Sequence, residues 1–115
     1  MKVVINKCYG GFGLSKEAVS RYFEIKGWKL VSVADEQFPS TTLYYKDSVS
    51  EDNYWYGRNI KRDDPTLVRV VEELGRKASG SYAELEVIEI PDDIEWVVEE
   101  YDGVEWVAEK HRTWR

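Results

Sequence analysis

The chain has 115 residues, 43% of them hydrophobic and 14% aromatic, which predicts one independently folding domain spanning residues 1–115. Its formal net charge of −6 argues against capture of duplex nucleic acid, which needs an extended basic surface. A single cysteine, Cys8, excludes an internal disulfide, and no apolar run approaches the roughly 18 residues of a membrane span. The start enters polar sequence too soon for a signal peptide, so we expect a soluble, cytoplasmic protein without a membrane partner.

The first part of the chain predicts a strand, a helix and two more strands. The apolar run Val3–Ile5 is typical of a short strand that is buried on both faces. Ser15 is a suitable N-cap, and the apolar stripe after it ends at Gly27, which predicts a helix between them. Residues 28–33 alternate in polarity and residues 41–46 are rich in β-branched and aromatic side chains, so both predict strands.

The middle of the chain predicts a loop and a second helix. Residues 47–63 form the longest polar stretch, and we expect a loop with ordered aromatic side chains there. Asp64-Pro65 starts a helix by two signals, an N-cap carboxylate and a proline at the first helical position. This helix ends at Gly75 or continues to about Ala78.

The last third predicts three strands. Residues 85–90 form a strand whose alternation slips, which predicts either a bulge or a strand covered on both faces. Asp102-Gly103 predicts a type I′ hairpin turn that places Tyr101 opposite Val104 and Glu99 opposite Trp106. The order β-α-β-β-α-β-β-β predicts an α+β fold, a largely antiparallel sheet with two helices packed on one face.

Residues 5–15, Ile-Asn-Lys-Cys-Tyr-Gly-Gly-Phe-Gly-Leu-Ser, indicate a place that holds a small anion. A strand passes into three glycines and then into a helix start, where backbone N–H groups and the helix dipole favour negative charge. Asn6 and Lys7 add a hydrogen-bond donor and a positive charge. The segment is neither a Walker motif nor a full dinucleotide fingerprint, so a tight turn explains its glycines equally well.

Residues 54–62, Tyr-Trp-Tyr-Gly-Arg-Asn-Ile-Lys-Arg, interleave aromatic and basic side chains, the pairing that stacks a base and neutralises its phosphate. In the alternative interpretation, Trp55 and the tyrosines cover the core while the basic residues pair with nearby acids. The end of the chain, residues 110–115, repeats this composition, although chain ends commonly fray.

Catalysis and metal binding have little support in the sequence. Ser15 and Ser20 have no partner base nearby, and Cys8 has only the distant His111. One histidine and one cysteine cannot form the usual metal clusters, so we expect no metal and no cofactor. The acidic residues between 84 and 109 are typical of a solvated sheet face, and a hidden carboxylate pair stays open as an alternative.

The motifs at 5–15, Arg-Asp-Asp-Pro at 62–65 with Val-Val-Glu-Glu-Leu-Gly at 70–75, and Glu-Lys-His-Arg-Thr-Trp at 109–114 resemble a widespread family of small bacteriophage proteins over nearly the full length. The resemblance implies the activity of phage anti-defence (anti-CBASS) sponges in the host cytoplasm. Such sponges bind a cyclic dinucleotide signal, such as cyclic GMP–AMP, and keep it from the antiviral effector.

A cyclic dinucleotide offers flat purines and phosphates, so its capture needs aromatic rings, backbone N–H groups and cations, without a nucleophile. We expect a homo-oligomer that shares the two-fold ligand. The rival class is a module that inhibits a host protein through the acidic hairpin around Trp96, Tyr101 and Trp106, and a nucleotide hydrolase comes third. The predicted ligand-binding residues are Asn6, Lys7, Tyr9, Gly10, Gly11, Phe12, Tyr56, Arg58, Lys61, Arg62, His111 and Arg112: Tyr9, Phe12 and Tyr56 for stacking, Gly10 and Gly11 for backbone contact, and Lys7, Arg58, Arg62 and Arg112 for phosphate.

Overall fold

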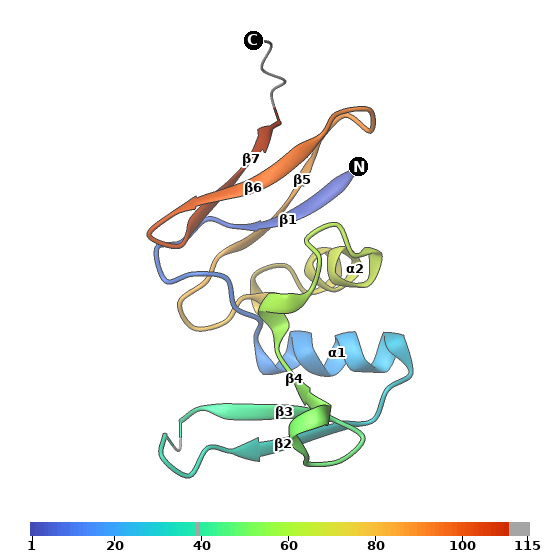
Figure 1. Cartoon of the computed structure of the whole chain (residues 1–115), viewed down its shortest axis with the longest axis vertical. Helices are drawn as coiled ribbons and strands as arrows, with labels where there is room; N and C mark the ends of the chain where they lie inside the picture. Colours follow the sequence, from blue (N-terminus) through green and yellow to red (C-terminus); the bar gives the residue numbers. More distant parts are fainter. Residues whose placement is uncertain (39, 111–115) are drawn as a thin grey trace.

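The structure is a computed structural model that describes residues 1–38 and 40–110. Within these residues it contains two α-helices, seven strands and three short 3₁₀ helices (Figure 1). In chain order they are β1 (Lys2–Asn6), α1 (Lys16–Lys26), β2 (Leu30–Ala34), β3 (Thr42–Lys46), η1 (Glu51–Asn53), β4 (Tyr54–Trp55), η2 (Gly57–Asn59), α2 (Pro65–Leu74), η3 (Gly75–Ala78), β5 (Leu85–Glu89), β6 (Trp96–Tyr101) and β7 (Val104–Glu109).

The predicted α+β class and the antiparallel pairing of the strands are confirmed. The described strands, however, divide into three sheets, β1-β5, β2-β3-β4 and β6-β7, where the sequence predicted one. Figure 1 shows α1 and α2 as a middle layer, with β2-β3-β4 on one side and the other two sheets on the opposite side. The two helices therefore lie between strand layers, and the predicted packing of both on one face of a single sheet is not confirmed.

The core lies where the helix layer meets β1 and β5. Val3, Val4 and Ile5 of β1 are almost completely buried, as predicted for a strand that is covered on both faces. Strand β1 contacts α2 and also β7, which places an element on either side of it. The helices bury the stripes that their spacing predicts, namely Ala18, Val19, Tyr22 and Phe23 on α1 and Leu67, Val68, Val70 and Val71 on α2.

The ends of both helices follow their local signals. The Ser15 hydroxyl accepts a hydrogen bond from the N–H of Ala18, and Gly27 closes α1 with a φ of 72°. The Asp64 carboxylate caps α2 by accepting from the N–H groups of Thr66 and Leu67. Helix α2 is capped at Gly75, the first predicted endpoint. The chain then continues as η3 to Ala78, the second predicted endpoint.

The segment expected as a loop, residues 47–63, contains η1, the short strand β4 and η2. The Trp55 ring packs against Phe23 with a centroid distance of 5.0 Å and against Tyr22 at 5.5 Å. Because side chains alternate along an extended chain, Tyr54 and Tyr56 point the other way and stay exposed. The interpretation of Trp55 as a core residue is therefore the one observed.

The hairpin turn is confirmed, because Asp102 and Gly103 both have positive φ, at 50° and 90°. The register is also the predicted one, with Tyr101 opposite Val104 and Glu99 opposite Trp106. Strand β5 pairs with β1 without interruption, so the predicted bulge is absent, and Val87 and Ile88 on its opposite faces are both partly buried.

Candidate functional site

The glycine segment after β1 packs tightly against two other parts of the chain. A methyl group on Gly10 would overlap the backbone carbonyl and Cβ of Tyr82. A methyl group on Gly103 would come within 2.6 Å of the Tyr9 carbonyl oxygen and the Gly11 nitrogen. The close approach of protein backbone therefore requires glycine at both positions.

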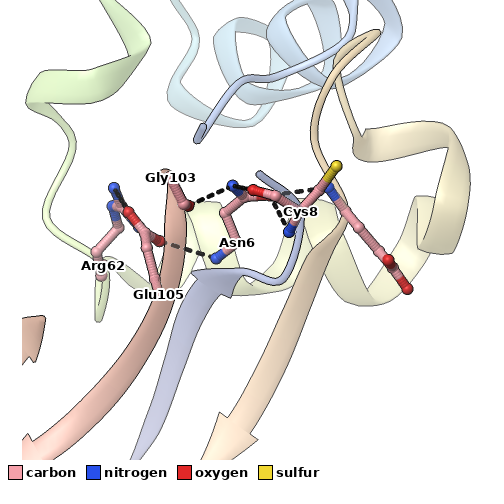
Figure 2. Close-up of polar contacts among 6 residues, drawn as sticks. Asn6, Cys8, Arg62, Gly103 and Glu105 are labelled. Carbon is pink, nitrogen blue, oxygen red and sulfur yellow. Dashed lines mark hydrogen bonds and ion pairs between the residues drawn. The ribbon is translucent and has the colours of Figure 1, made fainter. Parts of the chain in front are cut away.

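Asn6 ties these segments together, as Figure 2 shows. Its amide nitrogen donates to the carbonyl oxygens of Cys8 at 2.7 Å and Gly103 at 2.8 Å. Its side-chain oxygen accepts from the N–H groups of Cys8 and Glu84. Because Asn6 is 0% exposed and its amide is fully engaged, its predicted role as a ligand donor is replaced by a structural one.

Arg62 and Glu105 form a largely buried, bidentate ion pair next to Asn6 (Figure 2). The Glu105 carboxylate also accepts from the N–H of Asn6 at 2.8 Å, and the Arg62 guanidinium lies 3.7 Å from the ring centroid of Phe12. Phe12 itself is a buried core residue. The guanidinium predicted for phosphate therefore has a protein partner, and it covers one face of the ring predicted for stacking.

Two adjoining cavities border the glycine segment. The first, which we call the aromatic compartment, has a volume of about 210 Å³ and is lined by Tyr44, Tyr54, Trp55 and Tyr56 among others. The second, the glycine compartment, has a volume of about 480 Å³, and its lining includes Gly10, Gly11, Gly80, Ser81 and Tyr82. The two share the lining residues Phe12, Gly13, Leu14, Thr41 and Arg58.

Arg58 stands at the junction of the two compartments. It lies in η2, which follows the aromatic segment directly, and its guanidinium carbon lies 6.0 Å from the Tyr56 ring centroid. Its Nη2 would be 3.4 Å from a methyl group on Gly11, so the charge reaches the glycine backbone. Within residues 1–38 and 40–110, Arg58 forms no ion pair. A positive charge is therefore available beside both an aromatic wall and the glycine segment.

The helix start contributes less to anion binding than the sequence predicted. The Ser15 hydroxyl donates to the carbonyl oxygen of Lys77, and the Ser15 N–H donates to that of Ala78. These two carbonyl oxygens lie at the beginning of α1, where an anion was expected. The positive charge of the site comes from Arg58 and not from the helix terminus.

Tyr44 adds a polar group to the aromatic compartment. Burial raises the pKa of its hydroxyl above the ordinary value of 10, so the phenol stays neutral in the working pH range. A neutral phenol both donates and accepts a hydrogen bond. It can therefore recognise the edge of a bound ring system.

Three other predicted residues, Lys7, Tyr9 and Lys61, line neither compartment. Tyr9 is 73% exposed and Lys7 is exposed, and neither lines either compartment. Lys61 lines a separate cavity together with Tyr56 and Asn59. His111 and Arg112 lie outside the described residues. The predicted roles of these five side chains stay predictions.

The convergence of the three aromatic and basic segments is partial. Residues 5–15 and 54–62 meet at the two compartments, through Phe12, Tyr56 and Arg58. In the third segment, the structure describes Lys110. Its backbone N–H donates to the carbonyl oxygen of Glu95, at the end of the hairpin opposite the Asp102-Gly103 turn. That turn, and not Lys110, is the part of the hairpin that touches the glycine segment.

Several lining residues were not predicted from the sequence. Tyr54 had a readable signal, because the alternation in Tyr54-Trp55-Tyr56 places both tyrosines on the same side. The sequence contains no such signal for Tyr44, Thr41 or the segment 80–83, because only tertiary packing brings them to the glycine segment. The site is thus assembled from four separate stretches of the chain.

Comparison of the chain with models of known protein families, with curated proteins and with solved structures finds no match in any of the three. Neither helix in the described residues is long and apolar enough to cross a membrane. Within the same residues, no cluster of three or more His, Cys, Asp or Glu side chains is arranged to hold a metal ion. The functional conclusion therefore rests on the two compartments.

Proposed function

We propose that this protein binds a cyclic dinucleotide, such as cyclic GMP–AMP, and sequesters it without cleaving it. The observation that carries the proposal is the position of Arg58 between an aromatic compartment and a glycine compartment. A nucleotide needs this combination, a flat apolar wall for its base and a charge with exposed peptide groups for its phosphate. The resemblance of residues 5–15, 62–65 and 70–75 to small bacteriophage proteins favours an anti-defence role in the host cytoplasm.

Binding without cleavage is favoured by the chemistry of the lining. Among the described residues that line the two compartments there is no carboxylate, imidazole or amine to serve as a general base. The polar groups there are hydroxyls, peptide groups and one guanidinium. Such groups hold and orient a phosphate.

A symmetric homo-oligomer is the preferred form of the sponge. Each chain offers one aromatic compartment and one arginine at its edge, whereas a cyclic dinucleotide has two bases and two phosphates. Two copies related by a two-fold axis would present matching sets of contacts to the two halves of the ligand.

The direct test is recovery of the ligand. Purified protein is incubated with labelled cyclic GMP–AMP, freed of unbound label, and heated to release what it holds. We expect intact cyclic GMP–AMP in the released fraction. Altered ligand would indicate an enzyme instead, and no retention of any cyclic dinucleotide tested would contradict the proposal.

Arg58→Ala provides the matching variant. A hydrogen bond to a charged group contributes about 1.5–3 kcal/mol, so we expect affinity for cyclic GMP–AMP to fall roughly ten-fold to hundred-fold, as measured by calorimetry. Arg76→Ala is the control, because it removes the same charge from an exposed position in η3 that lines neither compartment. Equal affinities of the two variants would contradict the assignment of Arg58 to phosphate.

The second candidate is a module that inhibits a host protein through the hairpin, and one observation favours it. Tyr101 and Trp106 are exposed on the face of the β6-β7 sheet that they share with Val97, which is also exposed. Aromatic side chains of this kind are common anchors of protein interfaces. Trp96 lies on the opposite face and is partly buried, so it does not belong to that surface.

A further inference from the structure

The rings of Tyr54 and Tyr56 lie nearly parallel to each other. The ring planes differ by 18° and the centroids are 6.4 Å apart. The exposed fractions of the two side chains are 47% and 44%, so neither ring is part of the core. Trp55 between them points inward and anchors the segment against Phe23.

The spacing of the two rings suits a third ring between them. Stacked bases lie about 3.4 Å apart, so two rings with a planar guest between them stand about 6.8 Å apart. The strand rise of roughly 3.3 Å per residue brings side chains at i and i+2 to about this separation without strain. The observed centroid distance of 6.4 Å is close to that separation.

Neighbouring side chains support both tyrosines. The Tyr45 ring packs edge-on against Tyr54, with a centroid distance of 5.6 Å and an interplanar angle of 63°. The Arg58 guanidinium lies 6.0 Å from the Tyr56 ring centroid. Both rings border the aromatic compartment, and both also border the cavity of about 310 Å³ that contains Asn59 and Lys61. A guest between the rings would therefore have polar and charged groups within reach at its edges.

We propose that Tyr54 and Tyr56 form a clamp that takes one planar nitrogen heterocycle of nucleobase size between their rings, with the attached phosphate at Arg58. The inference deepens the proposed function and rests on it for the class of ligand. It gives Tyr54 a stacking role and places one base of the ligand between two rings. Stacking on a single wall would instead leave the other face of the base in water. Stacking against aromatic side chains tolerates any base, so the clamp recognises flatness more than base identity.

The first measurement uses the wild-type chain and needs no substitution. Cyclic GMP–AMP, AMP and GMP are added in turn, and the NMR signals of their base protons are followed. Protons of a base held between two aromatic rings shift upfield by more than those of a base stacked on one ring, and those of a base away from the rings do not shift. Unshifted base protons in a bound probe would overturn the clamp.

The second measurement compares substitutions. Tyr54→Leu and Tyr56→Leu should each weaken binding of the probe about five-fold to hundred-fold, in keeping with the cost of removing one stacking partner. Tyr54→Phe and Tyr56→Phe keep the ring and should bind as the wild type does. Tyr101→Leu, an exposed tyrosine on the hairpin, is the control and should have no effect. Equal binding by the leucine and phenylalanine variants would overturn the clamp.

The outcomes separate the clamp from the proposed function. If cyclic GMP–AMP is retained equally by the wild type and both leucine variants, the clamp fails and sequestration stands. If AMP or GMP binds through the tyrosines while cyclic GMP–AMP is not retained, the clamp stands and sequestration fails. If none of the three probes binds the wild type, both fail.

Discussion

Glu105 shows at the scale of one residue how a charge in a strongly acidic segment becomes part of the interior. Its carboxylate pairs with Arg62 and accepts from the N–H of Asn6, and its side chain is 7% exposed. Its partner Arg62 covers the Phe12 ring. Because paired and hydrogen-bonded charges are tolerated inside proteins, one carboxylate joins β7, β1 and the glycine segment.

We expect Glu105→Ala to lower the free energy of unfolding by about 3–5 kcal/mol, because it leaves the Arg62 guanidinium and the Asn6 N–H buried without a partner. Chemical denaturation measures the loss. Glu100→Ala is the control, since Glu100 lies directly opposite in the register but is exposed, and its loss should stay within about 0.5 kcal/mol. Similar losses for both variants would show that the buried pair does not contribute as argued.

At the scale of elements, side chains link α1 and α2 at two places. Arg21 of α1 donates to Glu73 of α2, which also accepts from Arg69. The Tyr22 hydroxyl donates to the Asp64 cap at 2.7 Å. Partial burial works to raise the pKa of Asp64, but the hydrogen bonds from Tyr22 and the N–H of Thr66 outweigh it, so the pKa is lowered.

The Glu73 contact predicts a dependence of stability on acid pH. Hydrogen bonds from Arg21 and then Arg69 lower the pKa of Glu73 from 4.5 to about 2. Since the folded-state pKa is the lower one, the contribution of this carboxylate is present above pH 4.5 and is lost as the pH falls towards 2. We therefore expect the difference in Tm between the wild type and Glu73→Gln to shrink over that range.

The control for this titration is Glu86→Gln, an exposed carboxylate in β5 that forms no ion pair within the described residues. Its Tm should follow that of the wild type at each pH, as measured by calorimetry. A constant difference in Tm between the wild type and Glu73→Gln from pH 5 to pH 2 would contradict the assigned pKa.

At the scale of the whole molecule, the β6-β7 hairpin is attached to the rest by few groups. It forms its own two-stranded sheet and contacts β1 without joining the β1-β5 sheet. Figure 1 shows its turn beside the segment that follows β1. Gly103 and Glu105 supply the polar contacts there, through Asn6 and Arg62. A two-stranded hairpin is marginal by itself, so these contacts hold it in place.

This arrangement predicts that backbone amides of the hairpin and of the core are protected unequally against hydrogen exchange. Amide protons of β1 and α2, which lie in the core, should exchange only through opening of the whole domain. Those of β6 should exchange at least about ten-fold faster through local opening of the hairpin. Hydrogen exchange followed by NMR distinguishes the two, and equal protection would show that the hairpin and the core open together.

The sequence predicted only part of the candidate site. The segments 5–15 and 54–62 were both identified, because glycines beside aromatic residues and cations are unusual in composition. The sequence did not show which side chains of those segments face the cavity, since Asn6 and Arg62 are engaged by protein partners far away in the chain. The pairing of Arg62 with Glu105 spans 43 residues, and no spacing rule reaches that far.

The sequence by itself determined most elements of this protein: both helices with their caps at Ser15 and Asp64, the order of the six longer strands, and the turn at Asp102-Gly103. Caps, apolar stripes and turn conformations depend on residues within a few positions of each other, so local free energies decide them. Only the tertiary structure decided the division into three sheets and the meeting of Arg58 with the glycine segment. These depend on which distant surfaces bury each other, and a local pattern of residues is compatible with many such pairings.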